Sequence, residues 1–374
     1  MTAAEDASES PAAIAETADG DRTIDEIDPT IPAEKGQLPL SVVVITENEE
    51  DRIADCIESV FAACRSIRAF EVILVDSAST DRTVEIANEY PVTILQIPEE
   101  HTVSCGAGRF VGDQVARGEF VLHVDGDMTL TESWLPAAID YLQENEKTVG
   151  AEGWLDESEA TDVTEVDKIG GVTLYDAEAL ATIGGFDPFL QGYEDIDVGF
   201  RLTTADKRLV RLPEVSASHD DEKTLGEPVR RLRQGYFVAP GQTIRKHLNS
   251  PTILWRLLAR QQYKIALLVW SIAGIGSLVS LSLFGGWLLI SVVGVALIVK
   301  KRGLVGALIF LVSKTLAIGG VADGLTRSPR PAAAYPLAAV EVVATGRVLE
   351  RSPLDEKEAV TEADQSEETE LGGG

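Results

Sequence analysis

The chain is poor in cysteine, and this shortage excludes two kinds of structure. Its 374 residues include only three cysteines, Cys56, Cys64 and Cys105. Their spacing contains neither a CxxC pair nor a zinc-binding pattern, so the sequence predicts no disulfide framework and no structural zinc site. We interpret all three as buried or incidental thiols.

Positive charge is also scarce. The sequence has 32 basic residues against 61 acidic ones, which gives a formal net charge of −29. A chain of this charge repels the phosphate backbone of nucleic acids, so no nucleic-acid partner is expected. An acidic excess keeps a protein hydrated where salt screens the repulsion between its charges, and we interpret it as typical of a halophilic archaeon. The alternative is that the two acidic tails of the chain account for part of it.

The N-terminal end lacks a targeting signal. Residues 1–37 have no basic start and no apolar core, so they do not form a secretory signal peptide, and their acidic composition predicts disorder. The C-terminal segment, residues 326–374, ends in a similar acidic tail from about Ser352.

Residues 38–225 alternate between strand-like and helix-like patterns. Four apolar runs, at residues 41–46, 70–76, 92–97 and 120–124, have the length of buried strands. Between the first two, apolar residues recur at helical spacing from Ile53 to Cys64. This alternation predicts an α/β fold in which a mostly parallel sheet carries helices on both faces.

The composition changes after residue 225. Residues 226–264 predict a linker and amphipathic helices, because residues 251–264 combine an apolar face with a basic face that suits a membrane interface. Residues 265–325 predict a transmembrane region with apolar segments at about 265–284, 285–299 and 303–322. The first segment has 20 residues without a charge, about the length that spans a bilayer. A buried helical core is the alternative, and it is strongest for the short second segment.

Basic residues flank these segments. Arg256, Arg260 and Lys264 precede the first, and residues 300–302 separate the second from the third. The positive-inside tendency places both groups on the cytosolic side of the membrane. The pattern therefore predicts a multi-pass protein of the cell membrane with a cytoplasmic catalytic domain. The third segment would carry the tail outward unless residues 335–346 return it.

Two aspartates follow the fourth apolar run directly. Asp125 and Asp127 are separated only by Gly126, and a turn is one explanation, since Asp and Gly are common turn residues. The alternative is a site for Mg²⁺ or Mn²⁺, because two carboxylates one residue apart can share a hard cation that completes its shell with phosphate oxygens.

The first two apolar runs also end in polar residues. The first is followed by Thr46, Asn48 and Glu49, and the second by Asp76 and Asp81. Each of these residues alone is compatible with capping or turn formation. Parallel strands, however, bring their carboxyl ends to one edge of a sheet, so together these groups favour a ligand crevice at that edge.

Four stretches of the chain resemble a known family. "SVVVITENEEDRIADCIESV", "EVILVDSASTDRTVEIA", "GEFVLHVDGDM" and "GGFDPFLQGYEDIDVGFRL" are similar in order and spacing to the family 2 glycosyltransferases, which have the GT-A nucleotide-diphospho-sugar transferase fold. The resemblance covers roughly residues 38–219. It extends to membrane-anchored members that build polyprenyl-linked glycans in archaea and bacteria.

The resemblance implies roles for individual residues on the donor side. Thr46, Asn48 and Glu49 match the first nucleotide-binding loop, and Asp76 matches the contact to the base, with Asp81 in the same motif. Asp125 and Asp127 match the DxD pair that binds the metal and the diphosphate. Arg109 matches a basic residue that faces the donor.

Three further residues are implied on the acceptor side and at the metal. Asp195 matches the catalytic base, and its neighbour Glu194 helps to shape the acceptor site. The alternative for both is a helix N-terminus, where acidic residues are favoured by the helix dipole. His219 matches a histidine that completes the metal shell, although a lone histidine is also a common bystander.

Taken with the apolar segments, the resemblance implies a metal-dependent, membrane-bound inverting glycosyltransferase. It would move a sugar from a nucleotide-sugar donor to a lipid-linked (polyprenyl or dolichyl phosphate) acceptor, in the assembly of a surface glycan or in protein N-glycosylation. A dolichyl-phosphate monosaccharide synthase and a non-catalytic membrane scaffold are the alternatives. A processive polysaccharide synthase is disfavoured because the chain has no Gln-x-x-Arg-Trp motif near its interfacial helix.

Overall fold

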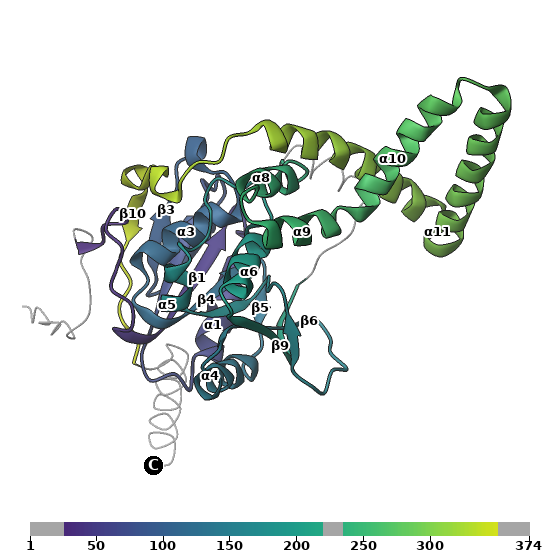
Figure 1. Ribbon diagram of the computed structural model, residues 1–374. Coiled ribbons are helices and arrows are strands. Elements are labelled where there is room, and N and C mark those ends of the chain that lie inside the picture. The colour runs from purple at the N-terminus through teal and green to yellow at the C-terminus, as the bar shows by residue number, and fades with distance from the viewer. Residues whose placement is uncertain (1–25, 220–234, 351–374) are drawn as a thin grey trace, which may run out of the picture.

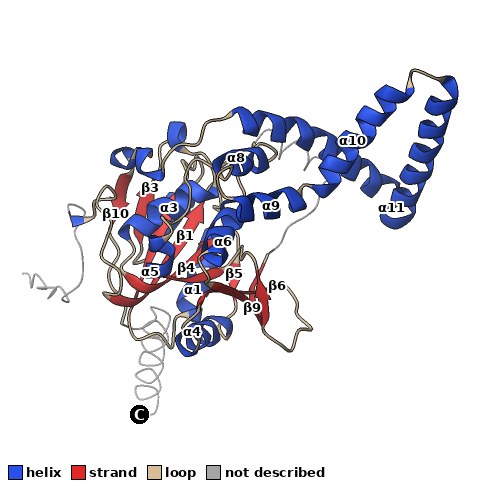
Figure 2. Cartoon of the chain, in the orientation of Figure 1, coloured by secondary structure: helices blue, strands red, loops and turns tan. Residues whose placement is uncertain are grey.

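A computed structural model of the chain describes residues 26–219 and 235–350. The tails predicted to be disordered, at residues 1–25 and 351–374, and residues 220–234 lie outside the described residues. Figure 1 shows an α/β domain from which a long helical arm extends to one side. Figure 2 shows the strands gathered in the centre of this domain with helices around them.

The central sheet is mixed, in the order β10-β3-β2-β1-β4-β8-β6-β9-β5, with β7 also paired to β9. Its first four strands along the chain are mutually parallel, and β8, β5, β7 and β10 join antiparallel. The strands are β1 (Leu38–Thr46), β2 (Phe70–Asp76), β3 (Thr93–Gln96), β4 (Gly118–Asp125), β5 (Thr129–Leu130), β6 (Thr148–Leu155), β7 (Thr164–Val166), β8 (Thr173–Asp176), β9 (Arg208–Ser218) and β10 (Glu341–Ala344).

Helices cover both faces of this sheet. Alternate residues of β1 belong to two different apolar clusters: Val42 and Val44 pack with α1 on one face, and Val43 and Ile45 pack with α3 on the other. The helices of this domain are α1 (Ile53–Ala63), α2 (Thr83–Ala87), α3 (Cys105–Val115), α4 (Trp134–Glu144), α5 (Ala177–Thr182) and α6 (Glu194–Thr204), with a 3₁₀ turn η2 (Glu99–His101). The predicted α/β architecture is confirmed.

Residues 26–37 are folded, so the prediction of disorder over residues 1–37 is wrong for this part. Ile27 is buried, with 4% of its surface exposed. Lys35 donates hydrogen bonds from Nζ to the carbonyl oxygens of Asp113 (2.5 Å) and Ala116 (2.6 Å) at the end of α3. These contacts satisfy carbonyl groups that a helix end leaves without partners, and they hold the segment on the domain.

The apolar region folds differently from the prediction. After α8 (Ala239–Lys246) and α9 (Pro251–Arg260), the apolar residues form α10 (Gln262–Ser277) and α11 (Leu281–Thr326). The break therefore falls at residues 278–280 and not between 284 and 285. Residues 285–299 and 303–322 share one 46-residue helix that is interrupted by the non-helical backbone of Gly303 (φ 72°, ψ 169°).

Only one helix in the described part of the chain, α11, is long and apolar enough to cross a membrane. The 16-residue α10 is shorter than a span requires. The prediction of a multi-pass region is therefore not supported. The end of α11 instead packs against the α/β domain, because Gly320 and Gly324 let its backbone approach Phe237 and Val238, which lead into α8.

The C-terminal segment returns to the sheet, as Figure 1 shows by the yellow strand at its edge. Two 3₁₀ turns, η3 (Ala332–Ala334) and η4 (Leu337–Ala339), lead to β10, which pairs with β3. Between them, the Tyr335 hydroxyl donates to the His101 carbonyl oxygen at 2.9 Å, and its ring lies 5.8 Å from that of Phe110. Residues 335–346 therefore do return the chain.

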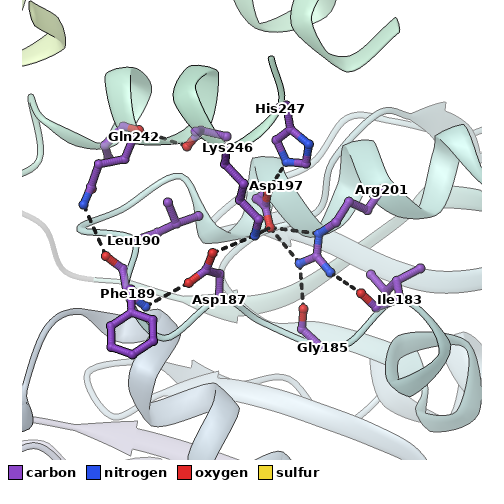
Figure 3. Close-up of polar contacts among 12 residues, drawn as sticks. Ile183, Gly185, Asp187, Phe189, Leu190, Asp197, Arg201, Gln242, Lys246 and His247 are labelled. Carbon is purple, nitrogen blue, oxygen red and sulfur yellow. Dashed lines mark hydrogen bonds and ion pairs between the residues drawn. The ribbon is translucent and has the colours of Figure 1, made fainter. Parts of the chain in front are cut away.

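A buried ionic cluster joins α6 to α8 (Figure 3). Asp197 has no exposed surface. Its carboxylate oxygens lie 2.6 Å from His247 Nε2, 2.9 Å from Lys246 Nζ and 2.7 Å from Arg201 Nη2. Lys246 also contacts Asp187 Oδ2 at 2.7 Å. Removing one partner of such a cluster leaves uncompensated buried charge, so the cluster fixes α8 on α6.

Apolar contacts extend this attachment to α9. Ile253 and Leu257 of α9 are buried in a cluster with Ile196 and Phe200 of α6. The guanidinium of Arg256 lies 3.9 Å from the centre of the Phe200 ring. Helix α6 is therefore held by both of the helices that precede the apolar arm.

We expect Asp197→Asn to lower the free energy of unfolding by about 3–5 kcal/mol, because Arg201, His247 and Lys246 lose the charge that compensates them. Burial alone would raise the pKa of Asp197, but the positive charge of Arg201, the hydrogen bond from His247 and the positive charge of Lys246 outweigh it and hold the pKa well below its usual range. The stability that Asp197 contributes is then fully present above its unfolded pKa of about 4 and is lost as the pH falls through the lower, folded pKa. Urea unfolding of the full chain in detergent, followed by circular dichroism from pH 8 to pH 3, measures both effects.

The matched control is Asp206→Asn, the same substitution at a residue whose side chain is 92% exposed, where a change within about 0.5 kcal/mol is expected. Equal losses in the two variants, or a loss at Asp197 that stays constant down to pH 3, would contradict this account of the cluster.

Candidate functional site

Polar residues line up at one edge of the sheet because three neighbouring strands end there. The parallel registers place Thr46 opposite Asp76 and Ile45 opposite Asp125. The carboxyl ends of β2, β1 and β4 therefore lie side by side, as the strand pattern predicted. At this edge the chain supplies carboxylates from separate loops to one region.

A pocket of about 580 Å³ lies at this edge. Asp125, Asp127, Asp195 and His219, all predicted as site residues, line it together. His219 Nε2 lies 3.1 Å from Asp127 Oδ2, and the His219 backbone N–H donates to Asp156 Oδ1 at 2.8 Å. The end of β9 is thus fixed so that its imidazole faces the DxD turn.

Arg109 connects the DxD turn to the start of α6. Its Nη2 lies 2.6 Å from Asp125 Oδ1 and its Nη1 lies 3.1 Å from Glu194 Oε1, and only 6% of the residue is exposed. Burial raises the pKa of both carboxyl groups, and the positive charge of Arg109 opposes that rise. A single buried guanidinium therefore keeps two acidic side chains close together.

Asp195 has a cationic partner of its own. Lys168 Nζ lies 2.7 Å from Asp195 Oδ2, and both side chains are partly exposed to the pocket. The ion pair with Lys168 therefore holds the Asp195 carboxylate at the wall of the pocket. The carboxylate stays accessible there to a hydroxyl group of a ligand.

The loop that follows β1, with Asn48 and Glu49, and the loop that follows Asp76 form a second group beside the pocket and do not line it. The Asn48 backbone N–H donates to Ser79 Oγ, and the Asn48 side chain accepts from the Thr80 backbone, both at 2.8 Å. Asn48 adopts a left-handed backbone (φ 56°), which Asn tolerates better than most residues. Glu49 adds another hydrogen bond between the two loops, because its backbone N–H donates to Thr83 Oγ1 at 2.8 Å.

The carboxylate of Asp81 is used within these loops. It accepts hydrogen bonds from the Thr83 N–H at 3.0 Å and from the Glu50 N–H at 3.2 Å. Asp81 therefore organises the loop backbone and does not reach the pocket. Arg52 links the loop to the DxD turn, because it contacts Glu49 at 2.5 Å and Asp127 at 4.0 Å.

Asp76 is fully buried behind the loop. Its Oδ2 accepts from the Ser79 N–H at 3.0 Å and from Gln96 Nε2 at 2.9 Å. Its Oδ1, like the hydroxyl of Thr46, has no hydrogen-bond partner among the described residues. A buried polar atom without a partner is costly, so these two atoms mark a place for a ligand group.

Gly126 brings the two groups of residues together. Its N–H donates to the Ile45 carbonyl oxygen at 2.8 Å, and a Cβ at this position would lie 2.9 Å from Thr46 Oγ1. Any other residue would push the DxD turn away from the first loop.

The side chains that could bind a divalent cation are of a suitable kind, but they are too few to complete its coordination shell. Asp125, Asp127 and His219 offer carboxylate oxygens and an imidazole to one pocket, and carboxylates suit Mg²⁺ and Mn²⁺. Within residues 26–219 and 235–350, no group of three or more His, Cys, Asp or Glu side chains forms a ready metal centre. These residues fit a cation that takes its remaining ligands from a bound diphosphate.

Several residues of the site carry no signal in the sequence. Lys168, Arg52 and Glu152 were not predicted, and neither were Trp154 and Arg211, which also line the pocket. Arg211 lies in a strand that also contains Arg208 and Glu214, so no local feature of the sequence distinguishes it.

Comparison with known proteins identifies relatives of one part of the chain. Residues 41–167 match the family model described as glycosyl transferase family 2. The undecaprenyl-phosphate 4-deoxy-4-formamido-L-arabinose transferase of Pectobacterium carotovorum subsp. carotovorum (strain PC1) is 32% identical over 120 residues, which are 30% of this chain and 36% of that protein. The low-salt glycan biosynthesis hexosyltransferase Agl6 of Haloferax volcanii is 34% identical over 104 residues, which are 28% of this chain and 24% of that protein. The chain thus spans about a third or less of the length of these relatives.

One solved structure shows the same fold over most of the chain. The mannosyltransferase PcManGT from Pyrobaculum calidifontis, in complex with GDP-Man and Mn²⁺, superimposes with a TM-score of 0.55. The match covers 79% of this chain and 90% of that chain at 18% identity. The predicted GT-A fold is confirmed.

We expect Arg109→Met to lower the free energy of unfolding by about 3–5 kcal/mol, because Asp125 and Glu194 are then left as neighbouring carboxylates without a cation. The matched control is Arg52→Met, which removes a cation that touches the same site but whose side chain is 45% exposed. That change should lower the free energy by less than about 1 kcal/mol. Urea unfolding at pH 7.5 compares the two, and similar losses would show that Arg109 is not the main compensating charge.

Proposed function

We propose that the chain, whose residues 41–167 match the family model described as glycosyl transferase family 2, transfers a sugar from a nucleotide-sugar donor to an acceptor hydroxyl with inversion of configuration. The observation that carries the proposal is the pocket in which Asp125, Asp127 and His219 meet Asp195. In this pocket an acidic pair that could hold a cation, and through it a diphosphate, lies with a carboxylate that could accept a proton.

The donor would lie along the carboxyl ends of β1, β2 and β4. Asp125, Asp127 and His219 would hold a divalent cation, Mg²⁺ or Mn²⁺, which supplies charge stabilisation to the departing diphosphate when bound. The unpartnered Asp76 Oδ1 and Thr46 hydroxyl offer acceptor atoms for N–H or O–H groups of the nucleoside. Arg109 keeps Asp125 at the correct distance from α6 while the donor binds.

Asp195 would act on the acceptor. Its carboxylate lines the pocket and is held by Lys168, so it is oriented before the acceptor arrives. As the acceptor oxygen attacks the anomeric carbon, its proton passes to Asp195. Because attack comes from the face opposite to the leaving diphosphate, the configuration of the transferred sugar is inverted.

The acceptor is proposed to be linked to a polyprenyl or dolichyl phosphate. Residues of α9, α10 and α11 expose large apolar side chains, among them Trp255 (74%), Ile272 (59%) and Leu289 (65%), as expected for a surface that meets lipid. The two curated relatives described above, one acting on undecaprenyl phosphate and one in glycan biosynthesis by their names, favour the same class of acceptor. Surface-glycan assembly or protein N-glycosylation is the corresponding process.

The helical arm would attach the catalytic domain to the cytoplasmic face of the cell membrane. Trp270 and Trp287 stack with ring centres 5.9 Å apart, so α10 and the first part of α11 form one hairpin. Because β10 pairs with β3 of the catalytic domain, the chain that enters the bilayer at α10 must return to the same side.

We expect Asp195→Asn to lower turnover by about 10²–10⁴-fold with the donor dissociation constant changed less than about twofold, because a general base acts on the chemical step. Asp127→Asn should instead weaken Mn²⁺-dependent donor binding. Nucleotide release and donor binding are measured with the full chain in detergent, across a panel of UDP- and GDP-sugars. Asp162→Asn, an exposed aspartate outside the pocket, is the control. Wild-type turnover in Asp127→Asn would exclude the metal assignment, and an absence of turnover in the parent chain with every donor would favour a non-catalytic scaffold.

The arm predicts a membrane topology. Single cysteines introduced at Glu99→Cys and Glu350→Cys, both at exposed positions before and after the arm, should react with a membrane-impermeant maleimide from the same side of sealed vesicles. The parent chain, with Cys56 and Cys64 buried, gives the background. Labelling of the two positions from opposite sides would exclude the returning hairpin.

A further inference from the structure

The pocket has a wall that the proposed transfer reaction does not use. Glu152 of β6, with 4% of its surface exposed, accepts from Arg211 Nε at 2.8 Å and from Arg211 Nη2 at 2.5 Å through Oε1. Its other oxygen accepts from the Gly170 backbone N–H at 2.8 Å. Both carboxylate oxygens are therefore engaged, and the guanidinium of Arg211 is held in a fixed plane.

That plane lies over the ring of Trp154. The Arg211 guanidinium carbon is 4.7 Å from the centre of the indole, within the range of a cation–π contact. Trp154 is 36% exposed, and both residues line the pocket. Among the described residues, no hydrogen-bond acceptor is found for Arg211 Nη1. An aromatic surface and a free guanidinium N–H group are thus offered to the pocket together.

This pair stands next to the proposed base. Gly170, which is bound to Glu152, separates the two groups, since a Cβ built on it would lie 3.1 Å from Asp195 Oδ2 and 3.3 Å from Lys168 Nζ. A ligand whose hydroxyl group reaches Asp195 therefore has its adjoining atoms in the part of the pocket lined by Trp154 and Arg211. Aromatic rings pack well against the apolar faces of ring-shaped ligands, and Arg binds carboxylate and phosphate.

We propose that Trp154 and Arg211 form a subsite for an acceptor sugar: the indole stacks on a pyranose ring, and the guanidinium binds an oxyanion attached to it. That oxyanion is the carboxylate of an acidic sugar or the phosphate that links the sugar to its lipid. The acceptor is then a lipid-linked saccharide and not a bare lipid phosphate. This inference rests on the proposed transferase function, and it names the substrate class of the same pocket.

The test measures binding of three probes to the full chain in detergent: citronellyl phosphate, citronellyl-phosphate-linked glucose and citronellyl-phosphate-linked glucuronate. The parent should bind both glycosylated probes at least about tenfold more tightly than the bare phosphate. Trp154→Ala, which leaves the Glu152–Arg211 pair in place, should remove that advantage, and Trp154→Phe should retain most of it. Equal binding of all three probes to the parent, or an unchanged advantage in Trp154→Ala, would overturn the subsite.

Arg211→Lys tests the guanidinium, because lysine keeps a positive charge beside the buried Glu152. A loss of affinity for the glucuronate probe alone identifies the carboxylate, and an equal loss for both glycosylated probes identifies the linking phosphate. No loss for either probe rejects the oxyanion contact. Arg208→Lys, on the same strand but with its side chain 58% exposed and outside this pocket, is the matched control.

Binding of UDP and GDP with Mn²⁺ separates this inference from the proposed function. All of these variants should bind the nucleotides within about twofold of the parent, because the donor residues are not altered. If the parent itself binds neither nucleotide, the transferase proposal fails whatever the lipid probes do. If nucleotide binding is normal and the probes behave alike, only the acceptor subsite fails.

Discussion

The crowding of carboxylates at one sheet edge is the constraint on which the rest of the structure depends. Asp125, Asp127, Glu194 and Asp195 come from two different elements, and like charges at such distances repel by amounts comparable to the stability of a whole domain unless cations lie between them. Arg109 serves Asp125 and Glu194, and Lys168 serves Asp195. The cations come from α3 and from the segment before β8, so the edge can form only when the whole domain has folded. The same pairing fixes the carboxylates in the pocket where we propose that a cation and an acceptor hydroxyl bind.

The sequence predicts the edge well and its partners poorly, for a physical reason. Apolar runs separated by helical patterns specify a parallel sheet, and a parallel sheet aligns strand ends, so Asp76 and Asp125 could be placed near each other in advance. The sequence has no regular spacing that identifies ion-pair partners. Arg109 and Glu194 are 85 residues apart in the sequence, and Lys246 and Asp197 are 49 residues apart. Asp197 shows the consequence, because next to Glu194 and Asp195 it has the pattern of a helix N-terminus, whereas in the structure it is a fully buried anchor.

The apolar region illustrates a second limit. Composition shows which residues avoid water, but the position of a helix break depends on a few backbone conformations. The basic residues 300–302 mark the place where Gly303 leaves the helical region, whereas residues 278–280 break the helix inside a run of apolar residues that carries no such mark. The return of the chain rests on the four-residue strand β10, whose partner β3 would otherwise expose an unpaired edge. Such short pairings depend on tertiary contact and have little local signal.

Helix α6 gives the arm and the pocket a common mechanical element. Its first turn carries both Asp195, the proposed base, and Asp197, which joins the cluster with α8, and Phe200 one turn later lies under Arg256 of α9. A base on a mobile surface loop would have no fixed distance from the membrane. A base at the position of Asp195 on α6 would have a fixed distance from the interface in which α9 would lie, because α6 packs on α9. Packed helices move as rigid bodies more readily than they deform. In the proposed reaction, the reach of Asp195 toward a lipid-linked hydroxyl would therefore be set by the contact between α6 and α9, and not by the linker that joins the domain to its arm.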